Sequence, residues 1–581
     1  MAAWRLPDRR PALIPASAES WAATLGRLVG RQWRAEWFGS PPHQWLISRP
    51  RPDGLAAAPR DFRPADIERG RLALAGSFAF DGLEQNAGPG STVWDRAAPS
   101  RAFAVQLHRM DWLRDLMASG EAGPRTALHY IQSWDKVFGV WNGFSWSAAC
   151  LSRRTFNLAC NLKRLVAQAP DQDDALLDLL ARHARHLLLL NDGPRWAAER
   201  AVSAAVAGSV LAGRAGERVM ARALAKLEPA LKAAVLADGG HASRSPEAGM
   251  ELLLDLLTLD DALLQLGRPP PEELTRAIDR LGAALRYFTL PDGRLASFQG
   301  GEQSQPDRVI AAAAFGDSER PQEPELAPPP SPSAPHSGYE KLIGRRLSVI
   351  VDAAPPARGA WSSTACAQPL ALEILAGRDR LVTGSGWSPR ADGRQGLRLT
   401  SAASTLTLGE NSAGAPITGM RAKVLGHRLE GGAKAVILRR HDAETGAWLE
   451  IEHDGWVAVF GLGHERRLFL DTAVDELRGE DRVRPSSEDA SGARRITQFA
   501  VRFHLQPGVR AEVDEAQKSI LLQGPSGSAW RLRSDAQETM LEPSVILQGG
   551  RPRRTSQVVM HGLIRSDRTG RIRWKLAEEP F

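Results

Sequence analysis

The most apolar stretch of the chain follows directly on a polar turn. Residues 238–240 (Asp-Gly-Gly) predict the turn, because glycine reaches positive φ without steric cost. Residues 245–247 (Ser-Pro-Glu) then have the pattern of a helix start, with a serine cap, a proline at the first helical position and an acid in the first turn. The residues that follow are apolar on one helical face at Met250, Leu253, Leu254 and Leu257, and on the other at Leu252, Leu256 and Leu259. A helix that is apolar on both sides lies in an interior, so we expect the polar residues at its start to border a cleft.

Helical periodicity extends from residue 103 to residue 289. Apolar positions recur at helical spacing in segments of similar length, which are separated by short turns rich in glycine and proline. The predicted helices are residues 103–118, 124–138, 145–167, 174–190, 195–212, 218–236, 246–266 and 271–289. Such short connections predict antiparallel helical hairpins.

The second half of the chain alternates between apolar and polar residues with the period of a strand. From residue 338 onward, about twelve or more short strands with regular turns predict a β-sandwich or stacked antiparallel sheets. The two-residue turn Asp454-Gly455 predicts a hairpin between WLEIEH and WVAVFG. A proline-rich stretch at residues 317–337 separates the two halves and has the composition of a linker.

The N-terminal part of the chain has a mixed pattern. Residues 21–37 are helical in pattern, and residues 51–100 are rich in glycine, proline and aspartate, which predicts an irregular coat with a short strand pair at residues 70–82. We therefore predict a mixed segment (1–100), a helical domain (101–292), a transition with a proline-rich linker (293–337) and a β-sandwich domain (338–581). A chain of 581 residues is long enough for several domains.

The overall charge is modest, with a net charge of +7 and a pI near 9.6. This balance would suit a polyanionic partner, although a solvated surface with more arginine than acid produces it as well. The positive charge is dispersed, and no nucleic-acid motif or phosphate-binding glycine loop occurs, so we expect no nucleic-acid or nucleotide partner. The three cysteines and the histidines lack metal-ligand spacing, so we predict no metal and no cofactor.

No segment of the sequence predicts insertion into a membrane. The first residues are interrupted by charges and prolines, and they contain no apolar run of signal-peptide length. Nowhere do about 18 consecutive apolar residues occur, so we expect no membrane span. As written, the sequence predicts a cytoplasmic protein.

Several local phrases, in order along most of the chain, carry a resemblance to one family. They are LHRMDWLRDL (107–116), DGGHASRSPE (238–247), LLDLLTL (253–259), SGYEKL (337–342), STLTL (404–408), HDGWVAVFGLGHERRLFL (453–470), LRGEDR (477–482), FHLQPGV (503–509) and RRTSQVV (553–559). In these phrases the chain resembles the heparinase II/III-like proteins of bacteria. The resemblance covers roughly residues 100 to 575 and implies an α/α toroid followed by an antiparallel β-sandwich.

The resemblance implies a polysaccharide lyase that acts on an acidic polysaccharide by β-elimination, and a location in the cell envelope or periplasm as the alternative to the cytoplasm. In such lyases an amide or a cation neutralises the uronate carboxylate, a histidine or tyrosine takes the C5 proton, and usually a tyrosine protonates the leaving oxygen. The family's Asn-His pair and the tyrosine after the DG phrase have no match in this sequence. The two histidines of the sandwich are also missing, since alanines precede Ser404 and Cys366 is the nearest match to the other histidine.

The polar turn offers different catalytic candidates. His241 could act as the base if its pKa lies near neutrality, and Arg244 could pair with a uronate or sulfate group through its planar guanidinium. Tyr339 opens the first sandwich strand and could face the toroid. The alternatives are structural: Arg244 could pair with Glu247 or Asp238. His241 could cap backbone groups, and Tyr339 could pack between the domains.

A second group of candidates concerns substrate binding. Trp141, Trp146 and Arg153 lie close together in sequence and could form a cleft with stacking rings and a cation, because aromatic faces stack on sugars. Interior packing is the alternative for the two tryptophans.

Three further residues are candidates for contacts with a polyanion. His186 and Asn191 occupy the region in which the resemblance would place the Asn-His pair. His464 stands beside two arginines and could reach an acidic glycan, or it could belong to a solvated face.

Three functional interpretations follow. The first is a polysaccharide lyase with a rearranged acid–base pair. The second is a glycan-binding protein that has lost elimination chemistry on a lyase scaffold, and the third is a structural or assembly protein that uses the sandwich as an interaction surface. The resemblance favours the first. The missing tyrosine, Asn-His pair and sandwich histidines, together with the absence of a visible export signal, favour the second.

Overall fold

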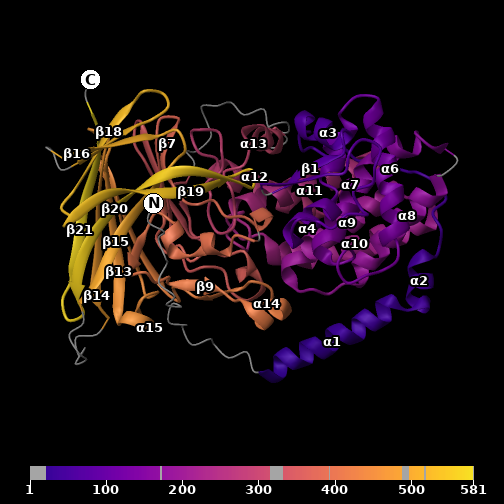
Figure 1. Ribbon diagram of the computed structural model, residues 1–581, viewed down its shortest axis with the longest axis horizontal. Coiled ribbons are helices and arrows are strands. Elements are labelled where there is room, and N and C mark those ends of the chain that lie inside the picture. Colours follow the sequence, from indigo (N-terminus) through magenta and orange to yellow (C-terminus); the bar gives the residue numbers. More distant parts are fainter. Residues whose placement is uncertain are drawn as a thin grey trace.

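Helices form the first half of the protein and antiparallel strands form the second, as the sequence pattern predicts (Figure 1). The computed structural model describes residues 21–579 except 81, 171–172, 315–330, 392, 487–495 and 516–518. Most of the predicted proline-rich linker therefore lies outside the described residues. The fold is an α/α toroid followed by a β-sandwich.

The helical half begins with a short series that precedes the long helices. These elements are α1 (Trp21–Gly39), α2 (Pro41–Ser48), α3 (Ile67–Leu74), the hairpin of β1 (Ser77–Phe80) and β2 (Leu83–Asn86), α4 (Arg101–Arg109) and α5 (Trp112–Met117). The long helices are α6 (Ala122–Phe138), α7 (Ala148–Val166), α8 (Asp173–Leu189), α9 (Ala197–Val210), α10 (Gly213–Ala234), α11 (Pro246–Gln265) and α12 (Glu272–Phe288), and the short α13 (Pro306–Ala313) follows.

Helix α9 is the centre of the toroid. Helices α7, α8, α10 and α11 all pack on it, and most of its residues are small and buried. The contact with α10 is especially close, because a Cβ atom on Gly208 would lie only 2.7 Å from the backbone nitrogen of Met220. Small residues at this position therefore allow the two backbones to approach.

Two predictions for the helical half are wrong in detail. The helix predicted at residues 103–118 is broken into α4 and α5, because Met110 adopts the left-handed conformation with φ 58° and ends the first helix. The strand pair predicted at residues 70–82 is a helix as far as Leu74, and the hairpin lies later, at β1 and β2. Its Phe78 belongs to the toroid core, so this segment is part of that domain.

Two large antiparallel sheets form the second half. One has the order β11-β12-β13-β14-β21-β18-β17-β16, and the other has the order β19-β20-β15-β7-β6-β5-β4-β3, with β8 also paired to β15. The strands of the first sheet are β11 (Val436–Ala443), β12 (Gly446–His453), β13 (Leu462–Asp471), β14 (Glu476–Pro485), β16 (Arg510–Asp514), β17 (Ser519–Gln523), β18 (Ala529–Ser534) and β21 (Gly570–Glu578). Those of the second are β3 (Ser333–Ala334), β4 (Tyr339–Ile343), β5 (Leu347–Asp352), β6 (Leu372–Ala376), β7 (Asp379–Thr383), β8 (Leu406–Leu408), β15 (Ile496–Leu505), β19 (Glu538–Gln548) and β20 (Arg551–Arg565). Their apolar faces form one continuous core.

The loop that follows β12 differs from the prediction. Asp454 accepts hydrogen bonds from the backbone N–H groups of Lys434 and Ala435, at 2.7 and 3.0 Å, and so anchors the loop instead of starting a tight hairpin. The predicted strand WVAVFG forms the short helix α15 (Val457–Phe460), with Trp456 buried beneath it. Strand β12 still pairs with β13, across this longer connection.

Helices α1 and α2 form an N-terminal arm (residues 21–48) along the edge of the molecule (Figure 1). The arm is fixed to the toroid by α2, where Nε2 of His43 lies 3.1 Å from Nδ1 of His186 on α8. Arg185 donates a hydrogen bond to the carbonyl of Ile47 at 2.7 Å, and buried Phe38 packs on both histidine rings. The body of α1 therefore projects from a well-anchored end. Within the described part of the chain, the helices are all too short or too polar to cross a membrane.

Candidate functional site

A cleft of about 500 Å³ lies where the toroid meets the sandwich. Its toroid wall is formed by α3, α4, α7, α9 and α11, and by the turn that precedes α11. The sandwich contributes residues 363–364, 387–390 and 426–427, together with Arg551. The start of α11 therefore borders a cleft, as the sequence predicts.

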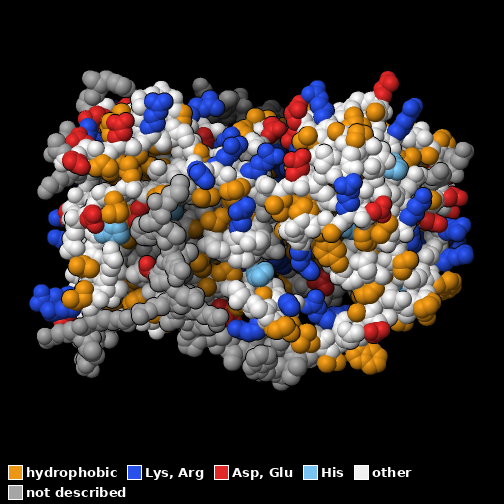
Figure 2. Space-filling model, in the orientation of Figure 1, with side chains coloured by type: hydrophobic (Ala, Val, Ile, Leu, Met, Phe, Trp, Pro, Cys, Tyr) orange, Lys and Arg blue, Asp and Glu red, His pale blue; other side chains and the backbone are white. Residues whose placement is uncertain are grey.

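The walls of the cleft carry more arginines than carboxylates. Figure 2 shows Lys and Arg side chains gathered along the boundary between the two halves of the molecule. The arginines that line the cleft are Arg63, Arg69, Arg101, Arg109, Arg114, Arg153, Arg195, Arg308, Arg390 and Arg551. The carboxylates are Asp111, Asp115, Glu199, Glu247, Glu251 and Asp255. The excess of cations favours an anionic ligand.

The carboxylates of the cleft are held mainly by arginines. Asp255 on α11 accepts two hydrogen bonds from Arg153, at 2.7 and 2.8 Å, and a third from Arg63 at 2.6 Å. Arg153 thus lines the cleft as predicted, but two of its donors are engaged in a bidentate pair. Asp111 is bound by Arg109 at 3.0 Å. Charges in the walls are therefore largely neutralised in pairs.

Among the carboxylates that line the cleft, Glu199 has the fewest hydrogen bonds. Its Oε1 has no hydrogen-bond partner among the described residues, and burial raises the pKa of Glu199. On the opposite wall, burial lowers the pKa of Arg390 to about 10. Arg390 pairs with Glu247 and its Nε lies 3.6 Å from Glu302, while Oε1 of Glu199 lies 4.0 Å from Nε of Arg153.

His241 lines the cleft, but its hydrogen bonds do not suit a general base. The hydroxyl of Ser243 lies 2.7 Å from Nδ1 of His241, and the backbone N–H of Ser243 donates to the same nitrogen at 3.2 Å. These bonds place the ring proton on Nε2, so the nitrogen that could accept a proton is already occupied. Burial, followed by the charge of Arg195, lowers the pKa of His241 to about 4. The imidazole is therefore neutral at pH 7.

Arg244 belongs to the contact between the domains. Its guanidinium is buried and donates to the carbonyls of residues 337, 338, 354 and 355, and to the carboxylate of Asp352 on β5 at 2.5 Å. Arg244 also has φ 64°, which turns its side chain away from the helix that follows. The predicted role in binding a uronate is not supported, because these contacts use its donors. The expected pairing with Glu247 or Asp238 does not form either, since Asp352 takes that place.

Tyr339 packs between the domains. Its hydroxyl donates to the carbonyl of Arg244 at 2.7 Å, its ring is completely buried, and burial raises the pKa of Tyr339 far above its usual range. Tyr287 bonds to the carbonyl of Tyr339 at 3.0 Å, and Tyr130 bonds to the carbonyl of Ala73 at 3.1 Å. These are the three tyrosines of the chain, and none of them lines the cleft. The candidate acid Tyr339 is therefore a structural residue.

Three candidate binding residues, Trp141, Trp146 and His186, lie near the arm and do not line the cleft. Trp141 is half-buried against Phe38 of α1, with ring centroids 5.9 Å apart. Trp146 and His186 are fully buried and pack on each other, with ring centroids 5.3 Å apart. The structure therefore brings them together behind the cleft wall, and the predicted stacking platform with Arg153 does not form.

The remaining two candidates are also distant from the cleft. Asn191 is exposed in the loop after α8. His464 is buried in the sandwich core, where it lies 2.8 Å from the carboxylate of Asp481 and 3.0 Å from His453. Neither is among the residues that line the cleft. Among the described residues, no group of three or more His, Cys, Asp or Glu side chains could hold a metal ion.

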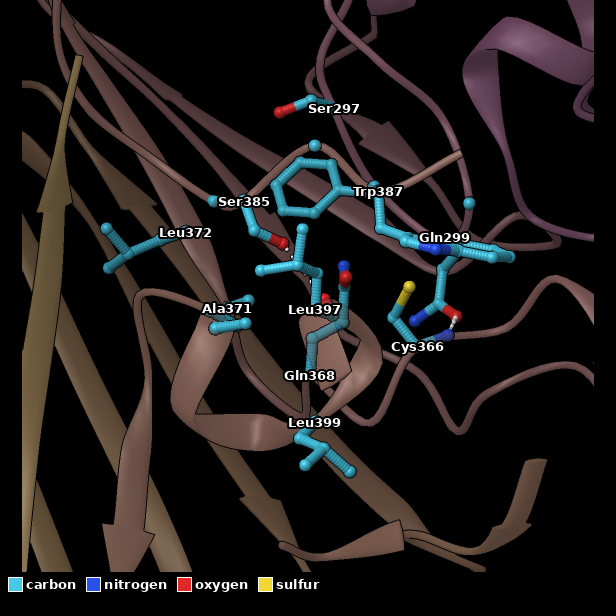
Figure 3. Close-up of a pocket in the computed structure, with 16 residues that line it drawn as sticks. Ser297, Gln299, Cys366, Gln368, Ala371, Leu372, Ser385, Trp387, Leu397 and Leu399 are labelled. Atoms are coloured by element: carbon cyan, nitrogen blue, oxygen red, sulfur yellow. Dashed lines mark hydrogen bonds between the residues drawn. The ribbon is translucent and has the colours of Figure 1, made fainter. Parts of the chain in front are cut away.

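A small hollow of about 10 Å³ lies behind the cleft, between the loop of residues 297–300 and the sandwich (Figure 3). Cys366 stands here, at the position that the resemblance assigns to a histidine. Its backbone N–H donates to the side chain of Gln299 at 3.1 Å, and burial raises the pKa of the Cys366 thiol to about 11. The thiol is therefore protonated at neutral pH and cannot replace a histidine as a proton acceptor.

The histidine and the tyrosine predicted as acid–base groups are not arranged for β-elimination. Elimination requires a base with a free lone pair and an acid that can protonate the leaving oxygen. His241 has its accepting nitrogen occupied, and the tyrosines lie elsewhere. The arginines remain able to attract carboxylate or sulfate groups.

Sequence reasoning missed most of the cleft. Arg101, Arg109, Trp196, Trp387 and Arg390 all line it, yet they lie on segments that are far apart in the chain. Trp196 stacks beneath Arg195, with 4.4 Å from the guanidinium carbon to the ring centroid. Arg101, Arg109 and Trp196 come from the toroid and Trp387 and Arg390 from the sandwich, so tertiary packing and not sequence proximity brings them together.

Comparisons with known proteins agree with this architecture. The family model described as heparinase II/III-like, C-terminal, matches residues 326–575. A relative named FtsZ-localized protein C, from Caulobacter vibrioides (strain NA1000 / CB15N), is 50% identical over 563 residues, which is 96% of each chain. Among solved structures, heparinase III has a TM-score of 0.69 at 14% identity and covers 97% of this chain and 93% of its own.

A second solved structure, a mutant of the heparan sulfate lyase HepC from Pedobacter heparinus, has a TM-score of 0.55 at 14% identity, with 97% of this chain and 91% of that chain covered. At such identities the likeness concerns the fold alone. The fold, the matched sandwich domain and the near full-length relative lead to the same conclusion: the chain belongs to the heparinase II/III-like family.

Proposed function

We propose that this chain is a bacterial cell-division protein that acts together with FtsZ and uses a lyase scaffold for binding, without catalysing β-elimination. The observation that carries the proposal is the 50% identity, over 96% of both chains, with a protein whose name describes it as FtsZ-localized. Identity at this level over nearly the full length favours shared partners as well as a shared fold. We accordingly place the chain on the FtsZ side of the membrane, which agrees with the cytoplasmic location expected from the sequence.

The composition of the cleft supports the non-catalytic part of this proposal. His241 is hydrogen-bonded as an acceptor at Nδ1, and Tyr339 is buried in the contact between the domains. A division protein that had retained the scaffold for binding would have no need of these groups in catalytic positions.

The N-terminal arm supports a place at the membrane surface. Val29, Trp33 and Trp37 follow one another at a spacing of four residues and form one exposed stripe on α1, with Trp33 75% exposed. Arg34 is exposed beside the stripe, whereas Arg31 projects from the opposite side of the helix and donates to the carbonyl of Lys423 at 2.8 Å. Tryptophan together with arginine on an amphipathic helix is typical of segments that lie in the headgroup region of anionic membranes. We therefore include an anionic membrane surface among the partners of the arm.

The α2 end of the arm extends the same surface. Trp45 is 68% exposed and Leu46 is 47% exposed, although the helix is anchored through buried His43. Large apolar side chains that stay in water next to a firmly docked helix mark an interaction surface.

Co-sedimentation with FtsZ polymers tests the proposal. The wild-type protein is expected to pellet with polymerised FtsZ and to remain in the supernatant with unpolymerised FtsZ. The His241→Ala variant serves as the matched control, because a change in the cleft should leave the contact unchanged. Absence of the protein from the polymer pellet would contradict the proposal.

A second candidate function is binding of an acidic glycan in the cleft, and the ten arginines that line the cleft favour it. Calorimetry with heparan sulfate oligosaccharides, alongside an assay for the ultraviolet absorbance of unsaturated uronate, tests this function. Binding without an absorbance change is the expected result. A growing absorbance that His241→Ala abolishes would instead establish a lyase.

A further inference from the structure

The hairpin of β19 and β20 reaches from the sandwich towards the toroid, and Figure 1 shows it in yellow. Its turn is Gly549-Gly550, in which both residues have positive φ, at 59° and 74°. On the toroid side, Cδ of Pro552 lies 3.7 Å from the position that a Cβ atom on Gly82 would take, in the turn between β1 and β2. The tip of the hairpin therefore lies beside both domains.

Two hydrogen bonds from backbone N–H groups hold the tip in place. Gly550 donates to the carboxylate of Glu302 at 2.9 Å, and Leu547 donates to the carbonyl of Ser385 at 2.8 Å. The side chains of Ile546 and Leu547 are completely buried. The exposed side chains of the tip therefore project from a fixed base, which lowers the entropic cost of binding a partner.

The tip carries three arginines at the start of β20. Arg551, Arg553 and Arg554 are exposed, and no carboxylate among the described residues forms an ion pair with any of them. Arg551 lines the edge of the cleft, and Arg553 lies two positions further along the same face of the strand. Arg554 projects from the other face, opposite Val545. Arg551 and Arg553 thus form one pair of exposed cations without an acidic neighbour.

The other sheet of the sandwich offers a comparison. On β13, Arg467 pairs with Glu465 at 2.7 Å, and on β14, Arg478 pairs with Glu476 at 2.7 Å. Each of these arginines has an acidic partner two positions away on its own strand. The arginines of the hairpin tip lack such partners, so their planar donors stay available for carboxylates of another molecule.

The chemistry of the tip favours an acidic peptide over a glycan. Residues 543–556 contain no aromatic side chain, so they offer no ring face on which a sugar could stack. Two positions along a strand span about 7 Å, which is also the spacing of alternate side chains in an extended peptide. Clusters of arginines are a recurring means of recognising acidic motifs in proteins.

We propose that Arg551 and Arg553 bind an extended acidic segment of a protein partner, with carboxylates on alternate residues of that segment. The inference rests on the proposed function, since it takes the partner to be FtsZ, and it names the surface that makes the contact. This surface shares no residue with the N-terminal arm, so we expect the contacts with FtsZ and with the membrane to be independent.

Co-sedimentation with FtsZ polymers at several FtsZ concentrations tests the inference. The double variant Arg551→Gln with Arg553→Gln is expected to weaken binding about tenfold, because charge-assisted hydrogen bonds are lost. The matched control is Arg554→Gln with Arg125→Gln, which removes the same charge from the other face of the hairpin and from an exposed position on α6. The control is expected to bind as the wild type does. Equal weakening by both variants would show a response to net charge alone and would overturn the inference.

A second probe tests the chemistry of the partner. A fluorescent peptide of alternating glutamate and serine is titrated with the wild-type protein, and its anisotropy is expected to rise. A peptide with glutamine in place of glutamate is expected to give no change, and an excess of the acidic peptide should release the protein from the polymer pellet. Equally tight binding of the acidic peptide by the wild type and by the double variant would overturn the inference.

Failure of the inference is distinguishable from failure of the proposed function. A wild-type protein that does not pellet with FtsZ polymers would contradict the proposed function and the inference together. A wild type and a double variant that pellet equally would overturn only the role of the hairpin. A double variant that loses binding of heparan sulfate oligosaccharides in calorimetry, but keeps binding of FtsZ, would assign the arginines to the second candidate function and would also overturn the inference.

Discussion

The cleft and the N-terminal arm are opposite kinds of surface. In the cleft, charged side chains face one another and neutralise one another, as Asp255 does with Arg63 and Arg153. On the arm, large apolar side chains such as Trp33 and Trp45 face water. Charges are therefore compensated within the cleft, whereas the arm leaves large apolar side chains in contact with water, which is typical of a surface that binds a partner.

The turn before α11 contributes to both the cleft and the contact between the domains. His241 and Arg244 are three residues apart, but His241 lines the cleft and Arg244 lies in the contact between the domains. Arg244→Ala is expected to destabilise the protein by about 3–5 kcal/mol, since it leaves Asp352 buried without its cation. Urea unfolding measures the loss. A decrease in the free energy of unfolding below about 1 kcal/mol would contradict the structural role of Arg244 and would favour a role in ligand binding.

The arm should respond to its own substitutions and not to those of the cleft. Trp33→Ala combined with Trp37→Ala is expected to weaken vesicle binding by about thirty- to a hundredfold, because each ring loses the gain of leaving water. Flotation at several lipid concentrations measures the change. The control is Ile310→Ala, which removes an equally exposed apolar side chain from α13. An equal effect of the control would mean that the binding is not specific to the arm.

The depressed pKa of His241 makes the stability of the folded protein depend on pH. The unfolded chain binds this proton near pH 6.5 and the folded chain only near pH 4, so stability falls as the pH drops through that window. His241→Gln is expected to remove about 1–2 kcal/mol of this acid sensitivity. Urea unfolding at pH 7 and at pH 5 measures it. An unchanged difference between the two pH values would show that the imidazole is not shielded from water.

The smallest expected effect concerns the second candidate function. Arg101 lines the cleft, is exposed and stacks on Phe144, with 5.4 Å between guanidinium carbon and ring centroid. Arg101→Ala should weaken binding of a heparan sulfate oligosaccharide about threefold and leave vesicle flotation unchanged. Calorimetry and flotation on the same preparation test both halves of this statement. A loss of flotation would contradict the expectation that the cleft and the arm bind their partners independently.

Local patterns predicted much of the fold. The cap Ser245 and the apolar faces of α11 were visible as spacing, because helix caps and periodicity are local properties. The strand expected after Gly455 failed, since alternation over five residues does not distinguish a strand from the helical turn of α15.

The site was harder to predict, because it depends on how the domains dock. Arg244 and Tyr339 have the chemistry of catalytic residues, yet the contact between the toroid and the sandwich buries both. The helix at Trp33 and Trp37 was predicted from its period, but nothing in that period indicates that its apolar stripe faces water. Exposure is a property of tertiary packing, which one sequence does not display.

Recruitment of FtsZ to vesicles by this protein is the most direct test of the central claim. FtsZ and anionic vesicles are mixed with the wild-type protein, with the double variant of Trp33 and Trp37, or with His241→Ala, and the floating fraction is analysed for FtsZ. FtsZ is expected to float with the wild type and with His241→Ala, and to stay behind with the double variant. FtsZ that fails to float with the wild type, or that is lost with His241→Ala alone, would contradict it.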